Sequence, residues 1–143
     1  MKESPIFVRS YDLLRWLIPA TIQFPRQQRF VLAEAVQRAA FELHEQLVQA
    51  TCAAQPEPVL QQADATLARL RTYLRLCRDL QLLSWGQHEH VARLVDEIGR
   101  LLGGWLNSAR GHARRVPEER TRHQKQSSAD GHGHGSSSEG GHS

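Results

Sequence analysis

The sequence has little of what marks a membrane protein or a secreted disulfide protein. No run of about 18 apolar residues occurs, so we expect no membrane-spanning segment. The N-terminus has neither the basic start nor the apolar core of a signal peptide, and a cytoplasmic location is expected. The only cysteines are Cys52 and Cys77, too few for a disulfide framework. We expect both to be reduced, with Cys77 packed as a small apolar side chain.

Motifs with a catalytic or cofactor-binding role are also missing. No strand-like alternation of apolar residues occurs, and hence no Gly-rich phosphate loop that follows a strand. No pair of His, Glu or Cys residues has metal-ligand spacing on two helices, and the C-terminal histidines lie in a Gly/Ser-rich stretch. We therefore expect no catalytic residue, no cofactor and no metal site. The sequence predicts a protein that is not an enzyme.

Lysine is scarce, and arginine carries almost all of the positive charge. Of the 18 basic residues only Lys2 and Lys125 are lysines, and the formal net charge is +3. A planar guanidinium forms bidentate contacts with phosphates and carboxylates. Because the overall balance is only mildly basic, the placement of the arginines carries more information than their number.

What the chain does contain is helical periodicity, in four segments between residue 5 and about residue 109. The first is predicted to begin at Ser4-Pro5, an N-cap followed by a proline in the first helical turn. It is expected to bend at Pro19 and to end at Pro25. Its predicted apolar seam consists of Phe7, Tyr11, Leu14, Ile18 and Ile22.

The other three segments have an apolar repeat close to a heptad. They are expected at about 27–52, about 58–82, and from a capping box at Ser84 and Gln87 to about 109. Their predicted seams are Leu32, Val36, Ala39, Leu43, Leu47 and Ala50, then Ala63, Leu67, Leu70, Leu74 and Cys77, then Val91, Val95, Ile98, Leu102 and Trp105. Four such helices with short connections predict an all-α fold, an antiparallel up-down-up-down four-helix bundle.

The composition changes after residue 110. Residues 127–143 contain a single apolar residue, Ala129. Such a stretch buries too little apolar surface to offset the entropy of ordering it. We therefore predict a bundle over residues 1–110 and a disordered low-complexity tail over residues 111–143.

Three arginines of the third segment, Arg71, Arg75 and Arg78, are spaced so that they share one shoulder of the helix, beside the apolar seam. Two interpretations of this arginine row remain open. It is either a solvated face, with Arg75 paired to Asp79 at i+4 and the side-chain stems covering the core. Or it is a site that binds phosphates or a partner protein.

Gly99 and Gly103 lie on one face of the fourth segment. A glycine inside a helix costs about 1 kcal/mol relative to alanine, which indicates a close approach of another backbone. That backbone belongs either to the bundle itself or to another subunit. Trp16 is expected on the outside of the first helix, on the same face as Arg9, and both are candidate contacts for another surface.

The quoted residues resemble a known family, that of Avd, the accessory protein of diversity-generating retroelements. The resemblance covers about residues 5–110, and it extends to the four-helix-bundle proteins encoded in intervening sequences of bacterial large-subunit rRNA genes. The motifs that carry it are Leu70-Arg71-x-Tyr73-Leu74-Arg75-Leu76, then Gln87, then Ile98-Gly99-Arg100-x-Leu102-Gly103-Gly104-Trp105-Leu106, together with Tyr11-Asp12-Leu13-Leu14 and Phe24-Pro25-Arg26 in the first helix and turn.

The resemblance implies a homopentameric ring of four-helix bundles. Such a ring associates with the error-prone reverse transcriptase and binds nucleic acid, template RNA or cDNA, during mutagenic retrohoming. The family's basic pair on the third helix falls on Arg71 and Arg75, whereas Arg78 extends the row by spacing alone. The mild net charge and the His/Gly/Ser tail depart from the family's pattern. The alternatives are a helical oligomeric module that docks proteins and binds no nucleic acid, and a relative of the rRNA-linked proteins without a retroelement role.

Overall fold

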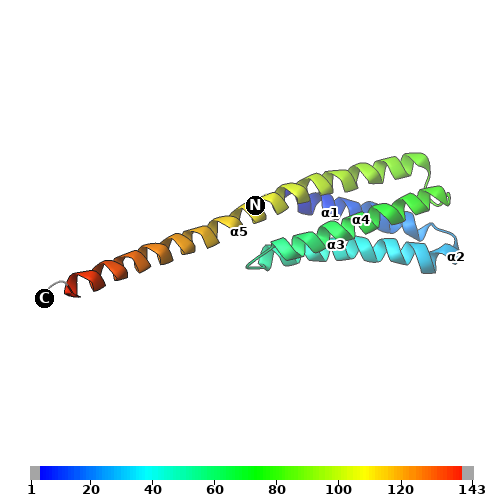
Figure 1. Cartoon of the computed structure of the whole chain (residues 1–143). Helices are drawn as coiled ribbons and strands as arrows, with labels where there is room; N and C mark the ends of the chain where they lie inside the picture. Colours follow the sequence, from blue (N-terminus) through cyan, green and yellow to red (C-terminus); the bar gives the residue numbers. More distant parts are fainter. Residues whose placement is uncertain (1–3, 140–143) are drawn as a thin grey trace. The chain divides into compact units, whose positions relative to one another are not determined.

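The computed structural model describes the backbone of residues 4–139 and the side chains of residues 4–112. Its helices are α1 (Pro5–Ile22), α2 (Arg26–Gln28), the π-helical turn η1 (Arg29–Ala33), α3 (Glu34–Cys52), α4 (Glu57–Asp79) and α5 (Trp85–Glu139) (Figure 1). The described residues contain no strand, which confirms the predicted all-α class. Within the described part of the chain, no helix is long and apolar enough to cross a membrane.

The chain forms two compact units, Met1–Asn107 and Ser108–Ser143. The first unit holds α1 to α4 and the beginning of α5. Because α2, η1 and α3 follow one another without a break, this unit contains four long helices, as predicted. Helix α5 continues to Glu139, through most of the segment for which we expect disorder from residue 111. That expectation is not confirmed by the described backbone, and residues 140–143 lie outside the described part.

The predicted seam of α1 is wrong by one residue. The buried side chains are Ile6, Ser10, Leu13, Leu17 and Thr21. Of the residues predicted to be buried, Tyr11 is 60% exposed and Ile22 is 53% exposed. The sequence did not predict the true seam because two of its members, Ser10 and Thr21, are polar. A polar residue in a helical repeat is normally assigned to the surface.

Both of these buried hydroxyl groups have partners on α3. Ser10 Oγ lies 2.8 Å from His44 Nδ1, and Gln37 Nε2 donates a hydrogen bond of 2.8 Å to Thr21 Oγ1. Thr21 also donates to the backbone carbonyl of Leu17 at 2.9 Å. A hydroxyl that is hydrogen-bonded in this way avoids the free-energy penalty of burying an unpaired polar group.

The predicted seams of the other helices are confirmed. Every residue of the seam that runs through η1 and α3 is buried, as is every residue of the α4 seam and the first four residues of the α5 seam. The last, Trp105, is half-buried, with its ring edge-on to Phe7 at 6.3 Å between centroids. The capping box at the start of α5 is also confirmed: Gln87 N donates to Ser84 Oγ at 3.1 Å, and Ser84 N donates to Gln87 Oε1 at 2.9 Å.

Side-chain contacts define how the helices run within this unit. From α1 to α3 they join Ser10 to His44 and Thr21 to Gln37. From α1 to α5 they join Arg9 to Glu97 and Trp16 to His90. From α4 to α5 they join Arg71 to Asp96 and Arg78 to Trp85. In each pair of helices the residue numbers rise on one as they fall on the other, so each pair is antiparallel.

Candidate functional site

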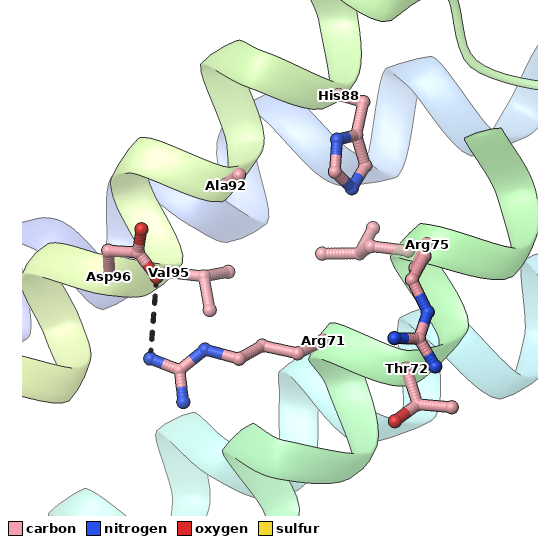
Figure 2. Close-up of a pocket in the computed structure, with 8 residues that line it drawn as sticks. Arg71, Thr72, Arg75, His88, Ala92, Val95 and Asp96 are labelled. Atoms are coloured by element: carbon pink, nitrogen blue, oxygen red, sulfur yellow. Dashed lines mark ion pairs between the residues drawn. The ribbon is translucent and has the colours of Figure 1, made fainter.

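A pocket of about 230 Å³ lies between α4 and α5. Its lining combines apolar side chains from both helices with charged and polar ones. The lining residues are Arg71, Thr72, Leu74 and Arg75 of α4, and His88, Ala92, Val95 and Asp96 of α5. In Figure 2, His88 and Val95 project from α5 toward α4, and Arg71 reaches from α4 toward Asp96. The structure thus places two of the three predicted arginines at one pocket.

The guanidinium of Arg71 is held against α5. Its Nη2 lies 3.5 Å from Asp96 Oδ1, in an ion pair that is largely exposed. It also lies over the backbone of Gly99, where an added Cβ would be only 2.6 Å from Arg71 Nη2 and 3.4 Å from Leu67 Cδ2. Gly99 therefore leaves room for an arginine side chain of the same bundle. At Gly103 an added Cβ meets nothing within 4 Å, so the described contacts give no reason for this second glycine.

Arg78 and Arg75 have different surroundings. Arg78 Nη2 is 3.0 Å from Asp79 Oδ1, its guanidinium carbon lies 4.7 Å from the centroid of the Trp85 ring, and its side chain is only 22% exposed. Asp79 therefore pairs with Arg78, and not with Arg75 as the solvated-face interpretation supposed. Arg75 is exposed, and no described carboxylate lies within ion-pair distance of it.

Helix α5 contributes three residues for which the sequence predicted no role: Trp85, His88 and Asp96. They recur at helical spacing on one face of α5 and run antiparallel to the arginine row. Trp85 is 75% exposed. Burial lowers the pKa of His88 below its usual 6.5, the positive charge of Arg78 adds to this effect, and Asp79 opposes it. These three residues of α5 and the three arginines of the row on α4 make up a set of six residues, which we call the α4–α5 site.

Arg9 and Trp16, the predicted interface residues of α1, contact the opposite flank of α5. Arg9 donates from Nε to Glu97 Oε1 at 3.0 Å and from Nη1 to Asp12 Oδ2 at 2.9 Å, and hydrogen bonds to these carboxylates raise its pKa. Trp16 is half-buried, and its ring is tilted over His90 with 5.4 Å between centroids. Both residues therefore have partners within the chain, in what we call the α1–α5 contact.

A comparison with protein-family models shows to which family the chain belongs. The bAvd-like family model matches residues 6–109. The chain belongs to the bAvd-like family. This is the family of Avd, the accessory protein of diversity-generating retroelements, as the motifs on α4 and α5 led us to expect. No match was found among the curated proteins. The α4–α5 site of this bAvd-like protein lies entirely within the matched residues.

The described part of the bAvd-like chain offers few groups for covalent or metal chemistry. No cluster of three or more His, Cys, Asp or Glu side chains within it is arranged to hold a metal ion. Cys77 is buried on the α4 seam, as predicted, and burial raises the pKa of its thiol to about 11. Such a thiol is almost wholly protonated at neutral pH and is a poor nucleophile. Cys52, in contrast, is exposed near the end of α3. What the α4–α5 site provides instead is positive charge, an exposed indole and a small apolar pocket.

Proposed function

We propose that this bAvd-like protein is a non-enzymatic accessory subunit of a diversity-generating retroelement. It binds the element's reverse transcriptase, and it binds nucleic acid, template RNA or cDNA, during mutagenic retrohoming. The proposal that it binds nucleic acid is supported by the charges of the α4–α5 site. Three arginines share one side of α4 there, and Arg75 has no ion-pair partner among the described residues.

The mechanism is electrostatic. Exposed ion pairs such as Arg71–Asp96 contribute about 0–1 kcal/mol, so a phosphate group can compete with the carboxylate for the guanidinium. Arg75 is available to a phosphate without breaking any described ion pair. Each phosphate that an arginine neutralises releases bound counterions into solution, which makes the affinity strongly dependent on salt and nearly independent of base sequence.

Assembly would multiply this modest attraction. The family resemblance implies a homopentamer, and a ring that repeats the α4–α5 site binds one long strand at several points. Linked sites of this kind raise the overall affinity through effective concentration, without any new contact. The proposed strength of binding therefore depends on oligomerisation as well as on the arginines.

Exposed apolar side chains support the protein-binding part of the proposal. Large apolar residues in contact with water are frequent at protein–protein interfaces, aromatic ones above all. On α1, η1 and α3 they are Val8, Tyr11, Ile22, Phe30, Val31, Phe41 and Val48. None of them lines the pocket of the α4–α5 site. We assign contacts with the reverse transcriptase to this set.

A salt titration of binding to single-stranded RNA tests the nucleic-acid part. The double variant R71A/R75A is expected to reduce the slope of log affinity against log salt by about 1.4, the value for two lost phosphate contacts on a single strand. The matched control is R38A/R69A, which removes the same charge from two arginines that are paired to Glu34 and Glu42. An equal loss of slope in both double variants would contradict a specific role for the α4–α5 site.

The exposed apolar residues also favour a second candidate, a module that docks proteins and binds no nucleic acid. The variant Y11S/F41S separates the two. Under our proposal it reduces copurification with the reverse transcriptase and leaves the affinity for RNA unchanged. If the unmodified protein copurifies with the transcriptase but has no salt-dependent affinity for RNA, the docking module is the correct function.

A further inference from the structure

The α4–α5 site contains more than the positive charge that phosphates require. Trp85 closes one end of the arginine row, with Arg78 over its ring at 4.7 Å, and most of the indole remains in water. Aromatic rings among arginines are the usual platform on which unpaired bases stack in proteins that bind single strands. Phosphate binding alone gives no reason for an exposed indole at this position.

The pocket has the size and lining for one ring. Its volume of about 230 Å³ is below the range of roughly 300–1,000 Å³ typical of small-molecule sites. Leu74, Ala92 and Val95 give it apolar surface, and His88 adds a ring with nitrogen atoms that donate or accept hydrogen bonds. A single phosphate would not use the apolar surface, whereas a base presents both a flat apolar face and a polar edge.

Three charged residues, Arg71, Arg75 and Asp96, also line this pocket. Asp96 forms an ion pair with Arg71, and Arg75 lies one helical turn further along α4 (Figure 2). Gly99 leaves room for the guanidinium of Arg71 against α5. From Arg71 to Arg78 the row spans about 10 Å along the helix axis. Positive charge therefore continues past the pocket to Trp85, in the direction that a bound strand would follow.

We propose that the α4–α5 site binds single-stranded nucleic acid through its bases as well as its phosphates: one unstacked base enters the pocket beside Arg71 and Arg75, and a nearby base stacks on Trp85. This inference rests on the proposed function, because phosphate contacts with the arginine row bring the strand to the site. Its consequence is a preference for single strands over duplexes, since paired bases are stacked and their faces are covered.

The test compares strands that differ only in their bases. The probes are a single-stranded RNA of about 20 nucleotides, a strand of the same length with abasic sugars throughout, and the corresponding duplex, all at the same salt concentration. We expect the full-length protein to bind the base-bearing strand several-fold more tightly than the abasic strand, with similar salt slopes. Equal affinity for these two strands would overturn the base-binding inference and leave phosphate binding intact. No affinity for either would overturn the proposed function, and this inference with it.

Two variants without a charge change locate the base contacts. A92L fills the pocket, and W85A removes the stacking platform. Each is expected to lower the affinity for the base-bearing strand several-fold and to leave the affinity for the abasic strand unchanged. The control L76A removes an exposed apolar side chain from α4 that does not line the pocket, and it is expected to change neither affinity. Circular dichroism checks that the variants are folded, and folded A92L and W85A proteins that bind the base-bearing strand like the original chain would overturn the inference.

Discussion

The two flanks of α5 carry the same kinds of residue but use them differently. On the α1 flank, Arg9 contacts two carboxylates and Trp16 is half-buried against His90. On the α4 flank, Arg75 has no described ion pair and the ring of Trp85 is mostly exposed. One set of residues makes contacts between helices, and the other is open to solvent. Residue type alone therefore does not distinguish a packing residue from an exposed one.

The difference lies in the balance of charges. The α1–α5 contact has two carboxylates, Asp12 and Glu97, for one guanidinium. At the α4–α5 site, Asp96 and the neighbouring Asp79 are two carboxylates for the three guanidinium groups of the arginine row. The first arrangement is saturated, whereas the second keeps an excess of positive charge. The formal net charge of only +3 conceals this local excess.

The largest expected effect comes from removing the two indoles. Since Trp16 is half-buried, W16A should lower the free energy of unfolding by about 1–3 kcal/mol. W85A should change it by less than about 0.5 kcal/mol, because Trp85 is mostly exposed. Urea denaturation measures both values. For RNA binding the order is reversed, and W16A should bind normally. Equal destabilisation by the two substitutions would show that Trp85 is a packing residue like Trp16.

Removing a carboxylate from the unsaturated flank should strengthen binding. D96N releases Arg71 from its ion pair and removes a negative charge that repels phosphates. We expect an increase in RNA affinity of about two- to fivefold at low salt, the amount that corresponds to one exposed ion pair. A salt titration by fluorescence anisotropy measures it. A loss of affinity instead would mean that Asp96 is needed to orient Arg71, and that orientation outweighs charge at this site.

The two flanks also show where the sequence was informative. Spacing within α4 predicted correctly that Arg71, Arg75 and Arg78 share one side of the helix. It could not predict that Trp85, His88 and Asp96 belong to the same site, because they lie beside the arginine row only when α5 packs antiparallel to α4. A row within one helix depends on helical geometry alone, whereas a site between two helices depends on their packing.

The error on α1 has a related cause. Apolar residues occupy more than one side of this helix, so the row from Phe7 to Ile22 and the row from Ile6 to Leu17 were both available. The true seam was masked by Ser10 and Thr21, whose hydroxyl partners His44 and Gln37 lie 34 and 16 residues away in the sequence. On α3 and α4 each apolar row is the single continuous one, and the predicted seams were correct.

A smaller effect is expected from His88, at the pocket. Burial and Arg78 lower its pKa, so the folded protein binds this proton more weakly than the unfolded chain does. The free energy of unfolding is therefore unaffected by His88 above its unfolded pKa of about 6.5, and it falls as the pH drops below that value. Between about pH 7 and about pH 5, the original chain should lose more stability than H88Q. Urea denaturation at several pH values measures this, and identical losses would show that His88 has the same pKa in both states.

The smallest effect is expected from removing a carboxylate on the saturated flank. E97Q takes away one of the two acidic partners of Arg9, but Asp12 still contacts the same guanidinium at 2.9 Å. Arg9 therefore stays neutralised, and the RNA affinity should rise by less than about twofold, in contrast to D96N. The same salt titration compares the two single-charge variants directly. If E97Q strengthens binding as much as D96N does, any added positive charge attracts the strand, and the excess of arginine over carboxylate at the α4–α5 site has no special role.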